Sequence, residues 1–194
     1  MPDNQFDIKG GNNQVVPNAT EAVTHIHNYV NSTRMDFYFK SLLEEIENGI
    51  TADVFEDLEF YRTRLDGEKD VEEKLTDGGF KPSRIKEAKR YKEMYRKVAE
   101  KYDCYPSAQK IFLALFARIK HEFDTSIFPL IEKQTELNIV MEQLRNKIVI
   151  PIMDTLEQNG RYDQHLNFTE DHIYGMIYYL TGMCHLNWVD YDYV

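Results

Sequence analysis

The chain has 194 residues, and its 42% hydrophobic and 13% aromatic content is enough to build one domain with a substantial core, which excludes disorder throughout. Its 33 acidic and 23 basic residues give a formal net charge of −10, which argues against general binding to nucleic acid or to anionic membranes. The start, "MPDNQFDIKG", lacks the features of a signal peptide, and no later run is long enough to span a membrane. Only Cys104 and Cys184 are present, so we expect reduced thiols and a cytoplasmic protein.

Residues 1–33 form a polar, amide-rich segment that includes "GGNNQVVPNA". Five of its residues carry the properties of a cross-β segment: Asn12, Asn13, Gln14, Val15 and Val16. The side-chain amides can stack in ladders, the valines favour strands, and the local charge is low. The segment therefore either pairs with other chains or copies of itself, or is a flexible, β-prone tail.

Residues 34–194 are predicted to be an all-α interaction domain, a single bundle of about six to seven helices. The first helix, "MDFYFKSLLEEIENG", is closed by Gly49. The second, "TADVFEDLEFYRTRLDG", is predicted to be capped by Thr51 and to end at Gly67. A short charged helix, "EKDVEEKL", then precedes the turn "TDGGFKPS".

Apolar residues at helical spacing continue to about Leu180. Ser83 is expected to cap a long helix, and the run after Ser107, "AQKIFLALFARIKHEF", is apolar on most sides, as is typical of a central helix. Pro129 and Pro151 are expected to end or kink the helices that contain them. Thr169 is the expected N-cap of the last helix, "TEDHIYGMIYYLTGMC".

The most basic stretch is residues 81–101, with nine Lys or Arg and three Glu. A nucleic-acid-binding helix would use four of these residues: Lys86, Arg90, Lys97 and Lys101. Residues 44–59 carry seven acidic and no basic residues, so the two stretches can instead pair within the fold or face a partner. The acidic total argues that the chain alone does not bind nucleic acid.

No catalytic, metal or cofactor motif is found in the sequence. His25 and His27, and His172 with Cys184 and His185, lack the tight spacing of a zinc site, and neither cysteine has a nearby base. We therefore expect no cofactor and no catalytic activity. An enzyme would need a pocket where titratable groups converge.

Two features of the last residues leave alternatives open. Gly175 and Gly182 allow close backbone approach, either within the bundle or by a partner. The aromatic end, "CHLNWVDYDYV", either folds back on the core or anchors an interface through Trp188, Tyr191 and Tyr193.

The segments "SAQKI", "IFPLIE" and the last helix followed by "HLNW" resemble the C-terminal-domain family of bacterial ABC-three-component conflict systems, related to Lamassu-type anti-phage defence. The resemblance covers residues 42–188. It implies a non-catalytic adaptor that couples an effector to an SMC-like ABC ATPase and a small middle component.

The sequence departs from that pattern before the domain, where an effector would normally stand. Residues 1–33 have no catalytic content, and "FDIKGGNNQVVPNATEA" resembles the short RHIM-like motifs of amyloid-type signalling. That likeness implies recruitment of an effector, or self-assembly, through the N-terminal motif.

Overall fold

The computed structural model describes residues 33–65 and 69–190, and this part of the chain contains helices and no strands. Its helices form seven continuous segments, two of which include a π-helical stretch, so the predicted all-α class is confirmed for the described residues. The N-terminal motif, with its predicted β-forming residues 12–16, lies outside the described residues, as do Tyr191 and Tyr193.

The first four helices are α1 (Arg34–Asn48), α2 (Glu56–Arg62), α3 (Val71–Asp77) and α4 (Pro82–Tyr102). Gly49 closes α1 with a positive φ of 64°, a conformation that favours glycine, as predicted. At the start of α3, Asp70 and Glu73 form a reciprocal capping box. Local sequence signals therefore fix both of these helix ends.

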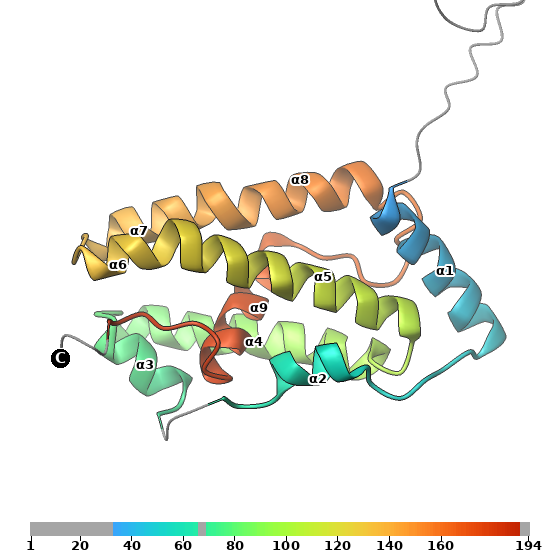
Figure 1. The fold of residues 1–194 in the computed structure, drawn as a ribbon, viewed down its shortest axis with the longest axis horizontal. Coiled ribbons are helices and arrows are strands. Elements are labelled where there is room, and N and C mark those ends of the chain that lie inside the picture. The colour runs from blue at the N-terminus through green and yellow to red at the C-terminus, as the bar shows by residue number, and fades with distance from the viewer. Residues whose placement is uncertain (1–32, 66–68, 191–194) are drawn as a thin grey trace, which may run out of the picture. The chain divides into compact units, whose positions relative to one another are not determined.

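Two long helical segments follow, and Figure 1 shows them side by side. One comprises α5 (Pro106–Glu122), the π-helical η1 (Phe123–Ile127) and α6 (Phe128–Glu132). The other comprises α7 (Leu137–Leu144), the π-helical η2 (Arg145–Val149) and α8 (Ile150–Asn159), and the last helix is α9 (Glu170–Gly182). Thr169 is the N-cap of α9, as predicted, and its backbone N–H donates to Nδ1 of His172 at 3.1 Å.

Two predicted helix starts are wrong. The second helix begins at Glu56 and not after Thr51, because residues 51–55 are held in a non-helical course by hydrogen bonds to α5. The long helix begins at Pro82, with Lys81 as N-cap, so Ser83 lies inside it. Proline is favoured at the first helical position, where its missing N–H costs nothing.

Neither Pro129 nor Pro151 ends its helix. Each is the second residue after a π-helical stretch, and both segments stay helical through the proline. In η1 the N–H of Phe128 bonds to the carbonyl of Phe123, five residues earlier. This shift in hydrogen-bond register accommodates a residue that cannot donate and whose ring crowds the preceding turn.

The core is centred on α4, α5 and α9. Tyr95, Phe112 and Phe116 are almost completely buried, and the ring of Tyr179 stacks on that of Phe116 with centroids 5.7 Å apart. Helices α4 and α9 make the most extensive contact among the described elements. Gly175 permits this contact, because a Cβ there would lie 2.2 Å from the carbonyl oxygen of Tyr91. Close packing within the bundle therefore accounts for Gly175.

Candidate functional site

The "SAQKI" segment at the start of α5 holds a buried polar network. Gln109 is completely buried, and its side-chain oxygen accepts from the Phe55 N–H at 2.8 Å. Its amide nitrogen donates to the carbonyls of Asp103 at 2.7 Å and Asp53 at 3.1 Å. One glutamine thus fixes the loop before α2 against the junction of α4 and α5.

Glu45 of α1 makes a second set of hydrogen bonds to the "SAQKI" segment. Its carboxylate accepts from the backbone N–H of Ser107 at 2.9 Å and from the Ser107 hydroxyl at 2.5 Å. A carboxylate at a helix N-terminus satisfies free N–H groups and interacts favourably with the helix dipole. The two polar side chains of "SAQKI" that are buried, Ser107 and Gln109, therefore have architectural partners.

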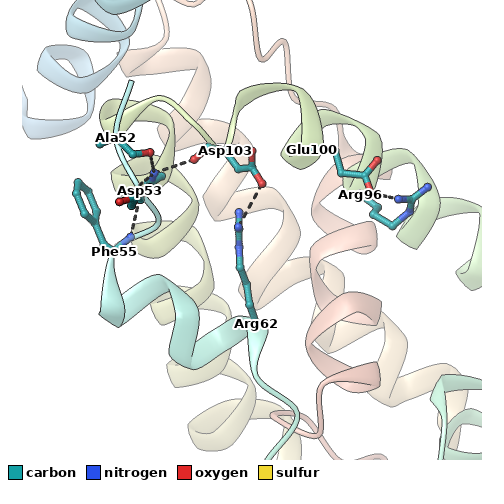
Figure 2. A network of polar contacts seen from close by, with 8 residues as sticks. Ala52, Asp53, Phe55, Arg62, Arg96, Glu100 and Asp103 are labelled. Atoms are coloured by element: carbon teal, nitrogen blue, oxygen red, sulfur yellow. Dashed lines mark hydrogen bonds and ion pairs between the residues drawn. The ribbon is translucent and has the colours of Figure 1, made fainter. Parts of the chain in front are cut away.

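Charged contacts continue this network along α4. Figure 2 shows Arg62, at the end of α2, reaching Asp103 after the end of α4, with a nitrogen-to-oxygen distance of 3.3 Å. Figure 2 also shows Arg96 paired with Glu100, one turn further along α4. Outside that view, Arg96 also pairs with Glu93 at 2.8 Å. The Arg62–Asp103 pair ties α2 to the end of α4, whereas both Arg96 pairs lie within α4.

Trp188, one of the predicted interface residues, is buried with 4% of its surface exposed. Its Nε1–H donates to the hydroxyl of Thr181 at 3.0 Å, and its ring packs edge-on against Phe80 and Phe123. Gly78 makes room for it, since a Cβ there would lie 2.7 Å from the Trp188 Cβ. The indole therefore packs on the core, which is one of the two alternatives that the sequence left open for Trp188.

An open groove of about 370 Å³ lies where the chain leaves Trp188. Its apolar lining comes from α6, α7 and the C-terminal segment: Ile131, Leu137, Val140, Trp188 and Val189. The charged residues among its lining are all acidic: Asp77, Glu132 and Asp190. This combination suits an apolar side chain flanked by basic groups on a partner.

The four basic residues predicted for nucleic-acid binding lie exposed on α4: Lys86, Arg90, Lys97 and Lys101. Their spacing of four, seven and four residues places them on one face of the helix. None forms an ion pair within the described residues, where α4 pairs with Glu72 and with its own glutamates. The acidic stretch 44–59 therefore does not neutralise this face.

The histidines of the described region have structural roles or stand apart from one another. His172 caps α9, and burial lowers its pKa. His185 is buried between the rings of Phe60 and Tyr61, and burial lowers its pKa as well. Within residues 33–65 and 69–190 no three His, Cys, Asp or Glu side chains are grouped as metal ligands.

No helix within residues 33–65 and 69–190 is both long and apolar enough to cross a membrane.

Comparison with known families identifies the chain. Residues 70–188, from the capping box of α3 to Trp188, match the family described as C-terminal domain 9 of the ABC-three component (ABC-3C) systems. The match covers more than half of the chain, so the chain belongs to this family. Neither a curated protein nor a solved structure matches it. As a component of a multi-protein system, the protein has protein partners.

Sequence reasoning missed the roles of Glu45 and Gln109. Gln109 stands among the apolar residues of a central helix, and a glutamine on such a helix signals a buried amide that needs partners. Glu45 gives no such signal, since it lies among other acids in "SLLEEIENG" and its partner is 62 residues away.

Proposed function

We propose that this protein is a non-catalytic adaptor subunit of a bacterial anti-phage defence complex of the Lamassu-related type. It docks on an SMC-like ABC ATPase, or on the small middle component, and recruits an effector through its N-terminal motif. The observation that carries this proposal is membership of the ABC-three component family over residues 70–188. A domain that belongs to a multi-component system functions by contact with the other components.

Several buried polar groups of the chain have structural partners. The buried or half-buried polar residues of the "SAQKI" network make structural contacts: Glu45 caps α5, Gln109 holds a loop, and Asp103 pairs with Arg62. Buried Asp36 likewise pairs with Arg161, at 2.8 Å. These groups act as supports for the helices.

The acidic groove beside Trp188 is the docking surface that we assign to the partner. Its lining lies entirely within the matched family region except for Val189 and Asp190, the two residues that follow it. Apolar residues form one part of the lining and carboxylates another. We expect a partner segment with an apolar anchor between Lys or Arg side chains.

Co-expression of the tagged full chain with the products of neighbouring genes tests the adaptor role. The wild-type chain should retain the ABC ATPase or the middle component. Glu132→Lys should reduce this retention about tenfold, since like charges would meet in the groove. Glu157→Lys is the matched control, because Glu157 is exposed on α8 and does not line the groove. Equal retention of the partner by the two variants would contradict the assignment of the groove as the docking surface.

The N-terminal motif has its own test. Replacing Gln14 and Val15 with proline should abolish effector recruitment and self-assembly, since proline cannot donate to a β-ladder. Retention of the ATPase should stay unchanged. Effector recruitment at the wild-type level would contradict the binding role proposed for residues 10–19.

The exposed basic face of α4 favours a second candidate function, nucleic-acid binding. Its four basic residues lie on one side of the helix, and none of them forms an ion pair with another described residue. A binding protein of this kind would lose affinity for DNA or RNA when Lys86 and Arg90 are both changed to Glu. Undetectable binding at physiological salt would rule this function out.

A further inference from the structure

A second pocket, of about 530 Å³, lies between the end of α2, the start of α3, one side of α4 and the end of α9. Five basic residues line it: Arg62, Arg64, Lys89, Lys92 and Arg96. Its acidic lining residues are Asp70 and Glu93. A pocket with an excess of positive charge is notable in a chain whose net charge is −10.

Three of the five basic side chains have a carboxylate partner. Arg62 pairs with Asp103, Lys89 with Glu72 at 2.6 Å, and Arg96 with Glu93. The acids are also engaged, since Asp70 accepts from the Glu73 N–H at 2.9 Å in the capping box of α3. Both acids therefore have contacts in the pocket wall, and their negative charges offset part of the positive charge of the lining.

Two cations of the pocket lack a carboxylate partner within the described residues. The exposed guanidinium of Arg64 donates to the backbone carbonyl of Lys69. Lys92 is half-buried and makes neither a hydrogen bond nor an ion pair with another described residue. Partial removal of an ammonium group from water disfavours its charged form, so an anion bound in the pocket would offset that cost.

The backbone around Lys92 is arranged to admit its ammonium group. A Cβ on Gly182, the last residue of α9, would lie 3.0 Å from the Lys92 Nζ, so glycine leaves the space that the ammonium uses. The C-terminal end of a helix attracts a cation. Nevertheless burial lowers the pKa of Lys92, so the surrounding groups do not fully compensate its charge.

We propose that this pocket binds a small, multiply charged phosphate compound, of the size of a nucleoside polyphosphate or smaller. Arg64 supplies a planar guanidinium fork, and Lys92 supplies a point charge at the pocket wall, the two groups that proteins combine to hold phosphates. The volume lies within the usual range for small-molecule sites. This site is independent of the adaptor role, and it is separate from the outward face of α4 that carries Lys97.

Calorimetric titration of the full chain with inorganic tripolyphosphate tests the site, with ATP as a second probe. Lys92→Met keeps the unbranched stem and removes the charge, and it should weaken binding about tenfold or more. Lys97→Met is the matched control on the same helix, because Lys97 is exposed and does not line the pocket. It should bind as the wild type does.

Two further variants separate a shaped site from diffuse attraction. Gly182→Ala leaves the charge unchanged but displaces the Lys92 ammonium, and it should weaken tripolyphosphate binding several-fold. Arg64 is exposed, so Arg64→Met should not disturb folding. This variant therefore tests the site even if Lys92→Met does not fold. We expect it also to weaken binding about tenfold.

The proposal is overturned by either of two results. One is the absence of heat with both probes at millimolar concentration. The other is an equal loss of affinity in Lys92→Met and Lys97→Met, which would indicate general electrostatic attraction to α4. Neither result bears on the adaptor role, which co-purification tests separately.

Discussion

Gln109 is the residue on which the loop before α2 depends. Its side-chain oxygen accepts from the Phe55 N–H, and its nitrogen donates to the carbonyls of Ala52, Asp53 and Asp103, so the side chain joins the loop before α2 to the junction of α4 and α5. A buried amide with every group satisfied rigidifies its surroundings, whereas removal of the side chain leaves several backbone groups unpaired. The same residue explains why the predicted start of α2 was wrong.

Replacing Gln109 with Ala should lower the free energy of unfolding by about 2–4 kcal/mol, since the buried backbone groups lose their partners and a cavity forms. Urea unfolding measures this. The matched control is Gln158→Ala, because Gln158 is exposed on α8, and it should change stability by less than about 0.5 kcal/mol. Similar losses in the two variants would contradict the role assigned to Gln109.

His185 makes stability depend on pH. Burial lowers its pKa in the folded chain, with the charge of Lys120 acting in the same direction, while backbone carbonyls at the end of α2 oppose the shift. The unfolded chain therefore binds a proton more readily, so His185 supports the fold above about pH 6.5, and this support is lost as the pH falls further.

Unfolding free energies measured between pH 7.5 and pH 5 should thus fall, with His185 contributing at most about 1.4 kcal/mol per pH unit. His185→Gln should flatten this dependence, whatever its effect on absolute stability. The exposed His121 provides the control, because His121→Gln should keep the wild-type slope. An unchanged slope in His185→Gln would show that other groups cause the dependence.

At the scale of the helices, sequence signals succeed where the cause is local. Gly49 closes α1, and Thr169 caps α9, because each position is decided by backbone geometry within one turn. The start of α2 depends on Gln109, more than 50 residues away in the chain, so no local pattern could reveal it. The π-helical stretches before Pro129 and Pro151 keep both segments helical through a residue type that usually ends or kinks a helix.

The candidate sites show the same difference between local causes, which the sequence reveals, and long-range causes, which it does not. The sequence identified the nine basic residues of 81–101, but which of them face a pocket depends on where α2, α3 and α9 lie. It therefore selected Lys97 and its neighbours on the outward face and missed Lys92. For Trp188 it offered two alternatives, since the depth of an aromatic side chain is decided by partners such as Thr181 and Gly78.

The contact between α4 and α9 gives a sharp test at this scale. Gly175→Ala should destabilise the fold by about 3 kcal/mol or more, because the added Cβ would meet the Tyr91 carbonyl oxygen at 2.2 Å and the two helices would have to separate. Gly182→Ala, on the same helix, meets only the movable end of Lys92 and should stay within about 1 kcal/mol of the wild type. Thermal unfolding compares them, and equal melting temperatures would contradict the close packing described for α4 and α9.

For the whole molecule, the described region carries surfaces of opposite character. The outward face of α4 is basic and exposed, whereas the groove beside Trp188 has an apolar lining and acidic residues. The network around Gln109 fixes the end of α4, the helix that bears the basic face, against the start of α5 and the loop before α2. A helical body that presents distinct surfaces suits a subunit that connects several components, which is the role proposed for this member of the ABC-three component family.

The most direct test of that role is the molar mass of the full chain purified after co-expression with the ABC ATPase of its own system, measured by light scattering during size-exclusion chromatography. The account predicts a stable complex that contains both proteins, with a mass well above the 23.0 kDa of the chain. Elution of the chain at its own mass, with the ATPase in a separate peak, would contradict the adaptor role.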